Sequence, residues 1–322
     1  MPETPRWRAL GPVAARVLQA VPILLVVAVV TFMLLHLLPG DPAAVIAGDQ
    51  APPEAIERIR HQLGLDRPLP EQLFLWLWNL AHGDFGKSLI LNQPVLSAIA
   101  ERLPVTLSLS AVSLVITLPI GIACGMLSAY FRNTWIDSVV MLLALLGVSL
   151  PSFWIAILSV LLFSVALGWL PTGGYVPLAD GFSPWLRALV QPAVVLALFQ
   201  LGFLARMTRS AMLDVLGREF IRTARAKGLS EWVAVTKHAF RNALIPVVTV
   251  TGIILSLLIG GSIIVEQVFS LPGIGRLVVQ GILLRDYPLV QGTMLLLGFA
   301  FVLLNLLVDL IYALLDPRLR RE

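Results

Sequence analysis

Six long apolar runs constrain what this chain can fold into. They cover residues 17–38, 105–131, 139–169, 188–205, 243–265 and 289–315. About 20 apolar residues are enough to cross a bilayer as a helix. Backbone polar groups in lipid must bond within their own segment, so runs of this length favour helices. The sequence therefore predicts an all-α, polytopic membrane helix bundle with about six transmembrane helices.

Composition supports this fold class. The 322 residues are 58% hydrophobic and only 13% charged, whereas soluble domains are about 25% charged. Cys124 is the only cysteine, which excludes an internal disulfide and a cysteine-cluster metal site. No basic patch with interleaved aromatic residues is present, so nucleic acid is not an expected partner.

A seventh apolar stretch, residues 268–284, is interrupted by Pro272, Gly273, Gly275 and Arg276. Such breakers and a charge argue against a membrane span. We expect an external loop here, with a short helix or a re-entrant turn.

The distribution of Lys and Arg predicts the orientation. The polar loop 206–242 carries eight of these residues, and the tails 1–16 and 316–322 carry three each. Region 39–103 has five, offset by eight acidic residues. Because cytoplasmic loops are enriched in Lys and Arg, we expect both termini and the polar loop in the cytoplasm.

The resulting organisation has five parts: a cytoplasmic tail 1–16, a first span 17–38, an extracytoplasmic region 39–103, a core 104–315 with five more spans, and a tail 316–322. A cleaved signal peptide is the alternative for the first run. That run is longer than the 7–15 apolar residues of a signal peptide, so we expect it to be retained.

Region 39–103 predicts two short helices. Ile56, Ile59 and Leu63 share one helical face, and after Pro70 the residues Leu73, Trp76, Leu77 and Leu80 form a second stripe. The region could contact an external protein or could pack on the membrane helices for stability, and the sequence does not separate these readings.

Gly86-Lys87-Ser88 resembles the end of a phosphate-binding loop. The full motif needs a glycine where this chain has Ala81, and no buried strand precedes it. We therefore expect this chain to bind no nucleotide and to hydrolyse none.

The centre of the polar loop predicts two helices broken by a glycine. Basic residues would end the first helix, Gly228 can adopt a left-handed conformation, and Ser230 is a good N-cap for the second. Small residues around the break would let another protein approach closely. The alternative is an ordinary positive loop that only fixes topology.

The centre of this loop, Arg222-Thr223-Ala224-Arg225-Ala226-Lys227-Gly228-Leu229-Ser230, is followed by His238-Ala239-Phe240-Arg241-Asn242-Ala243 and Pro246. These residues resemble the coupling loop of the dipeptide/oligopeptide/nickel family of binding-protein-dependent ABC importer permeases. The general permease motif, Glu-Ala-Ala with a Gly four residues after the last Ala, is matched only at Ala224 and Gly228. Further family-like phrases include residues 38–42, 63–66, 83–86, 206–209, 285–288 and 305–310, and the long first external region resembles the first permease subunit type.

The resemblance implies a type I importer transmembrane domain in the bacterial inner membrane. It implies a heterodimer with a second permease subunit, two cytoplasmic ABC ATPases that bind ATP and Mg, and an extracytoplasmic substrate-binding protein. A short helix around residues 226–235 would dock into an ATPase groove. Peptides are the expected cargo, with nickel chelates, glutathione or another small solute as alternatives.

Two acidic residues are candidates for the pathway or a gate. Asp309 is the only acid well inside an apolar run, and Glu266 lies just beyond the fifth run. A structural helix contact is the competing reading for Asp309, and an interface marker for Glu266. The four scattered histidines predict no metal site; for His36 we expect a packed or snorkelling side chain.

Two other function classes were weighed. An ion-coupled secondary carrier would need charged relays in its spans and usually an internal repeat, and one acid with no clear repeat does not favour it. An intramembrane enzyme is disfavoured because no His-Glu-x-x-His, paired intramembrane aspartates or Gly-x-Ser-x-Gly appears.

Overall fold

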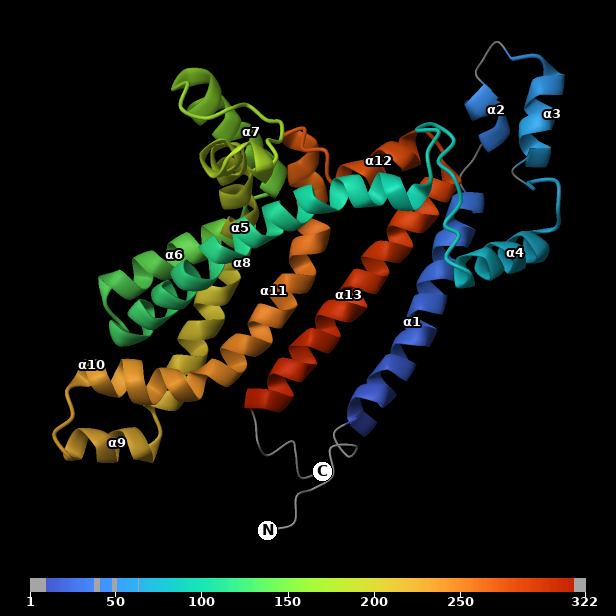
Figure 1. Cartoon of the computed structure of the whole chain (residues 1–322). Coiled ribbons are helices and arrows are strands. Elements are labelled where there is room, and N and C mark those ends of the chain that lie inside the picture. Colours follow the sequence, from blue (N-terminus) through green and yellow to red (C-terminus); the bar gives the residue numbers. More distant parts are fainter. Residues whose placement is uncertain (1–9, 38–40, 48–50, 63, 316–322) are drawn as a thin grey trace. The chain divides into compact units, whose positions relative to one another are not determined.

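The computed structural model describes residues 10–37, 41–47, 51–62 and 64–315 (Figure 1). Within these ranges the chain is helical, and its only strand-like feature is an isolated bridge between Lys87 and Pro94. The chain forms two compact units, one of residues 1–103 with 277–306 and one of residues 104–276 with 307–322. Each unit is described by itself below.

The first unit contains the N-terminal helix, the external region and parts of three helices that continue into the second unit. These elements are α1 (Leu10–Leu37), α2 (Pro42–Ala47), α3 (Pro53–Gln62), α4 (Leu69–Ala81), the start of α5 (Val95–Tyr130), most of α12 (Ile274–Leu283) and most of α13 (Tyr287–Leu315). The two helices predicted for the external region are α3 and α4.

The second unit contains the remainder of α5 and the helices that follow it. These are α6 (Trp135–Ser149), α7 (Ser152–Ser159) with the π-helical turn Val160–Ala166, α8 (Phe182–Leu216), α9 (Glu219–Ala226), α10 (Glu231–Val233) with the π-helical turn Ala234–Ala239, and α11 (Phe240–Val268). The short helix expected in residues 268–284 is α12.

Four of the described helices are long and apolar enough to cross a membrane: residues 95–130, 182–216, 231–258 and 287–308. The third predicted run differs from expectation, because α6 and α7 meet at a bend of 100°. Pro151 lies at this break, where its missing N–H cannot continue the helical ladder. The pair α6 and α7 is a fifth candidate span, broken or re-entrant. The first run lies in α1, whose side chains before residue 21 are outside the described part.

Several helices are longer than their apolar runs, and the extensions are largest in α5 and α8. α5 begins ten residues before residue 105, and α8 extends from residue 182 to residue 216. These extensions carry Glu101 and Arg102 in α5 and Arg206 and Arg209 in α8, and such charges end an apolar run before the helix itself ends.

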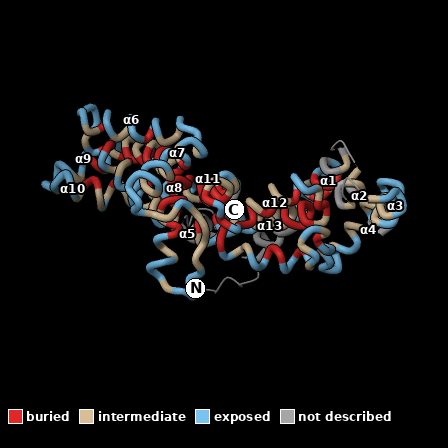
Figure 2. The backbone as a smooth tube through the Cα atoms, turned by 90° about the horizontal axis from the view of Figure 1, so that it is seen from above, coloured by how far each residue is buried: buried red, intermediate tan, exposed pale blue. Residues whose placement is uncertain are grey.

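α8 is the central helix of the second unit, with buried residues along most of its length (Figure 2). It packs against α6 and α11. A Cβ at Gly202 would lie 2.2 Å from the carbonyl oxygen of Ala144, and one at Gly125 would lie 2.5 Å from Thr208. Glycine thus permits the close backbone approach that is common between membrane helices.

Candidate functional site: the turn around Gly228

The polar loop folds as a tight helical hairpin at the end of α8. α9 ends at Ala226, and α10 begins at Glu231, with four residues between them (Figure 1). Gly228 has φ +83°, a left-handed conformation that L side chains avoid. The break predicted at Gly228 is therefore present.

Two backbone hydrogen bonds close this turn. The amide of Gly228 donates to the carbonyl of Arg225 over 2.9 Å, and the amide of Leu229 donates to that of Ala224 over 3.3 Å. This pair of bonds is the Schellman motif, which satisfies the last carbonyls of a helix. The turn is thus built locally by its own residues.

An ion pair spans the turn. The Nε and Nη2 atoms of Arg225 donate to the two carboxylate oxygens of Glu231 over 2.8 and 2.5 Å. Hydrogen bonding to Glu231 raises the pKa of the Arg225 guanidinium. Arg225 therefore connects the two helices, a role the sequence pattern did not suggest, since it predicted only an interaction with the helix end.

α9 is anchored by a single buried side chain. Ile221 is fully buried in an apolar cluster with Met212, Val215, Val235 and Ala239. The other α9 residues predicted for the site, Arg222, Thr223, Arg225 and Ala226, are exposed, and Ala224 is half-buried. One face of α9 therefore fixes the turn, and the opposite face is free among the described residues.

Aromatic side chains flank the exposed face. Trp232 is 63% exposed and Phe220 41% exposed. The ring of Trp232 meets that of Tyr130 edge-on, with centroids 6.1 Å apart. Exposed aromatic residues beside a rigid turn are typical anchors of protein interfaces.

Two details differ from the sequence-based expectation. Ser230 occupies the N-cap position of α10, but its side chain makes no capping hydrogen bond. Residues 226–235 do not form one helix, because the turn of Lys227, Gly228, Leu229 and Ser230 interrupts them. Gly228 ends a helix through its positive φ, so the continuous helical elements are α9 and the segment from Glu231 onward.

A buried ion pair supports the base of the turn. Arg209 of α8 donates to both carboxylate oxygens of Asp137 over 2.8 and 2.7 Å, and Asp137 also accepts from Ser128 and from the amide of Asn133. Only 8% of the Asp137 side chain is exposed. The pair ties the α5–α6 connection to α8 two turns before α8 ends. The sequence pattern did not predict this ion pair. Its signal was Asp137 at the edge of the apolar run 139–169, because a buried acid needs a counter-charge.

Glu266 lies away from this turn, near the end of α11, and its fully buried carboxylate faces the start of α12. Its carboxylate accepts from the hydroxyl of Thr106 over 2.7 Å and from the amide of Arg276 over 3.0 Å. A Cβ at Gly273 would lie 2.3 Å from this carboxylate. The Glu266 carboxylate therefore caps the first turn of α12. Its role in a gate stays a prediction. The side chain of Asp309 lies outside the described residues.

The hydroxyl of Ser88, at the end of the segment Gly86-Lys87-Ser88, is bound by a carboxylate of the same chain. The Asp286 carboxylate accepts from the hydroxyl of Ser88 over 2.6 Å and from the amides of Leu89 and Ile90 over 3.0 and 3.2 Å. Its second oxygen accepts from the amide of Leu289 in the first turn of α13.

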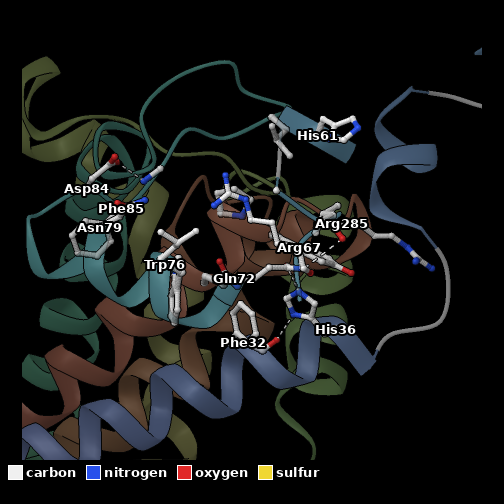
Figure 3. A pocket seen from close by; sticks show the side chains of 18 residues that line it. Phe32, His36, His61, Arg67, Gln72, Trp76, Asn79, Asp84, Phe85 and Arg285 are labelled. Carbon is white, nitrogen blue, oxygen red and sulfur yellow. Dashed lines mark hydrogen bonds between the residues drawn. The ribbon is translucent and has the colours of Figure 1, made fainter. Parts of the chain in front are cut away.

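The first unit has a cavity of about 430 Å³ beside α1 and α4 (Figure 3). His36, Arg67, Trp76 and Arg285 are among its lining residues. Among the described residues, no group of three or more His, Cys, Asp or Glu side chains is placed to hold a metal ion. His36 is packed, as expected: its ring lies 4.2 Å from that of Phe32.

Comparison with known proteins gives the family. Residues 121–321 match the family described as binding-protein-dependent transport system inner membrane component, and residues 10–110 match its N-terminal counterpart. A protein of Brucella abortus (strain 2308), whose name assigns it to a peptide transport system as a permease, is 61% identical over 95% of this chain and 98% of its own length. The glutathione transport system permease protein GsiC of Escherichia coli (strain K12) is 44% identical over 97% of this chain and 99% of its own length.

A solved structure supports the fold. The MetNI methionine ABC transporter, in an inward-facing conformation, aligns with a TM-score of 0.57 at 22% identity, covering 69% of this chain and 97% of the matched chain. With the family matches over nearly the whole sequence, the chain belongs to the family of inner membrane components of binding-protein-dependent transport systems.

Proposed function

We propose that this chain is the permease subunit of an ATP-driven importer and forms, with a second homologous permease subunit, a pathway for di- and oligopeptides. The observation that carries the proposal is the rigid turn around Gly228, built in a chain whose relatives are transport permeases. Peptide is the favoured cargo because the 61% identical relative is assigned to peptide transport.

The chain supplies the pathway, and its partners supply the energy. Two cytoplasmic ABC ATPase subunits bind ATP and Mg, and an extracytoplasmic binding protein delivers the solute. We infer that the chain itself carries no ATPase site, since its phosphate-loop-like segment lacks the first glycine of the full motif and has Ala81 there. Both termini and the turn face the cytoplasm, as the distribution of Lys and Arg predicts.

The exposed face of α9 and the turn form the ATPase-coupling surface. Phe220 and Trp232 are the apolar anchors, and Gly228 allows the partner's backbone to come close, since a Cβ there would meet nothing within 4 Å. Ile221 transmits the partner's movement to the apolar cluster in which it is buried. The ion pair of Arg209 with Asp137 transmits this movement from α8 to the start of α6. Alternating access follows if the ATP-bound and ATP-free ATPases favour different arrangements of the helices.

Reconstitution tests this function. The permease pair, the ATPases and the binding protein are placed in proteoliposomes, and uptake of labelled dipeptide is measured with and without internal ATP. We expect uptake only with all components and ATP. Uptake by this chain alone, driven by an ion gradient, would instead establish a secondary carrier.

Glutathione is the second candidate cargo, favoured by the 44% identical GsiC relative. Selection of the solute rests with the binding protein, so its retained ligand decides between the two. Isothermal titration of the purified binding protein with dipeptides and with glutathione makes the distinction. Tighter binding of glutathione would replace peptide as the cargo and leave the importer mechanism intact.

A further inference from the structure

One face of α4 is left uncovered by the part of its unit that the structure describes. Phe74 is 63% exposed and Trp78 is 57% exposed, although both are large aromatic residues. They lie one helical turn apart, and their rings stack with centroids 6.3 Å apart. The opposite stripe of Leu73, Trp76 and Leu77 is half-buried. α4 is therefore apolar on both sides, and only one side is covered by the protein.

The covered side holds α4 against the end of α1 (Figure 3). The side-chain oxygen of Gln72 lies 3.1 Å from Nε2 of His36, and the ring of Trp76 stacks on that of Phe32 at 6.0 Å. Phe32 and His36 lie in the last two turns of α1. The position of α4 along α1 is fixed by these two contacts.

This position corresponds to the membrane boundary. α1 has 28 residues, so it is about 42 Å long, against about 30 Å for the hydrocarbon core. Phe32 and His36 lie six and two residues before the end of the apolar run 17–38, which is about 9 and 3 Å along the axis. α4 therefore packs against the outer end of this run, at the boundary between the hydrocarbon core and the headgroups, when α1 crosses the membrane.

The chemistry of the uncovered face suits lipid. Residues 72–81 contain no Asp, Glu, Lys or Arg, while the pair of Arg67 and Glu71 lies at the start of the helix. His82 lies at the other end, with its ring 4.7 Å from that of Trp78. Amphipathic aromatic rings concentrate at the level of lipid headgroups. Exposed aromatic rings also anchor protein interfaces, so the position of α4 beside the outer end of α1 is what selects lipid as the occupant here.

We propose that α4 is an interfacial helix whose Phe74 and Trp78 side chains insert into the outer lipid boundary of the bilayer. The occupant of the exposed face is the headgroup–acyl region of phospholipid, next to the exposed apolar side chains Val26 and Val30 of α1. Insertion anchors the external region 39–103 to the membrane and fixes the outer end of α1. The proposal is independent of the cargo and of the coupling surface.

Site-directed spin labelling tests the proposal in the assembled complex in nanodiscs. Cys124 is the only cysteine, so Cys124→Ser gives a cysteine-free background for Trp78→Cys, Asn79→Cys and Leu25→Cys. Leu25 is a 51% exposed residue of α1 and serves as the lipid-facing control. The collision rates of each nitroxide with oxygen and with a water-soluble nickel chelate are measured, with and without the binding protein.

We expect the label at position 78 to favour oxygen over the chelate several-fold, as at position 25, whereas the label at position 79 favours the chelate. Chelate preference at position 78 would overturn the proposal. So would protection of position 78 from both reagents, which would show a protein occupant, or protection that appears only with the binding protein. As a label-free readout, brominated phospholipid should quench the Trp fluorescence of the wild type more than that of Trp78→Phe, and equal quenching would also refute insertion.

Discussion

Replacing Gly228 with valine should uncouple the transporter without preventing its insertion. Gly228 has φ +83°, and a non-glycine residue in the left-handed region costs about 1–2 kcal/mol, with a β-branched residue at the upper end or beyond. A Cβ would meet nothing within 4 Å, so the cost is backbone strain and not a clash within the chain.

This strain energy is comparable with the free energy contributed by the contacts that close the turn. The two Schellman hydrogen bonds contribute about 0.5–1.5 kcal/mol each, and the exposed Arg225–Glu231 pair contributes about 0–1 kcal/mol. A penalty of about 1–2 kcal/mol reduces the population of a local structure by a factor of about 5–30. Gly228→Ala should therefore lose part of the coupling, and Gly228→Val nearly all of it.

Gly228→Asn separates the two possible roles of this glycine. Asparagine tolerates the left-handed conformation but is bulkier than alanine. If the turn geometry matters most, Asn should retain more activity than Ala; if close approach of the ATPase matters most, Asn should retain less. The assay is peptide uptake and binding-protein-stimulated ATP hydrolysis by the reconstituted complex. Wild-type transport by Gly228→Val would refute the coupling role.

Three further substitutions test the parts around the turn and the external region. Ile221→Ala should cost about 2–5 kcal/mol of local packing and speed trypsin cleavage of the loop, whereas Ile221→Val should cost about 0.5–1.5 kcal/mol; equal cleavage rates would contradict the anchor. Arg209→Ala should lower the free energy of unfolding by about 3 kcal/mol, the low end for a buried pair, because Asp137 loses its counter-charge but keeps the hydrogen bonds from Ser128 and the Asn133 amide. Arg209→Lys should recover only part of this loss, measured as the melting temperature of the complex in detergent. Asp286→Ala should remove the acceptor of Ser88 and of three amides at about 1–3 kcal/mol for each group left unsatisfied, and Asp286→Asn should be milder; a melting temperature equal to that of the wild type would refute this anchor.

Much of the fold could be predicted because its cause is local. Apolar runs of about 20 residues require helices in lipid whatever surrounds them. Gly228 ends a helix by its own conformational freedom, so the break was visible without a structure. Pro53 and Gly64 likewise bounded α3 correctly.

The sequence by itself thus determined the helical membrane fold, the family-like coupling loop and the glycine turn within it, because each depends on the chemistry of a few neighbouring residues. Only the tertiary structure decided which distant side chains meet. Arg209 pairs with Asp137, which is 72 positions away in the sequence, and Asp286 binds Ser88, which is 198 positions away. Only it showed that α4 leaves Phe74 and Trp78 uncovered. Hydropathy marks a residue as apolar or charged, but its partner depends on how helices pack, which no single segment encodes.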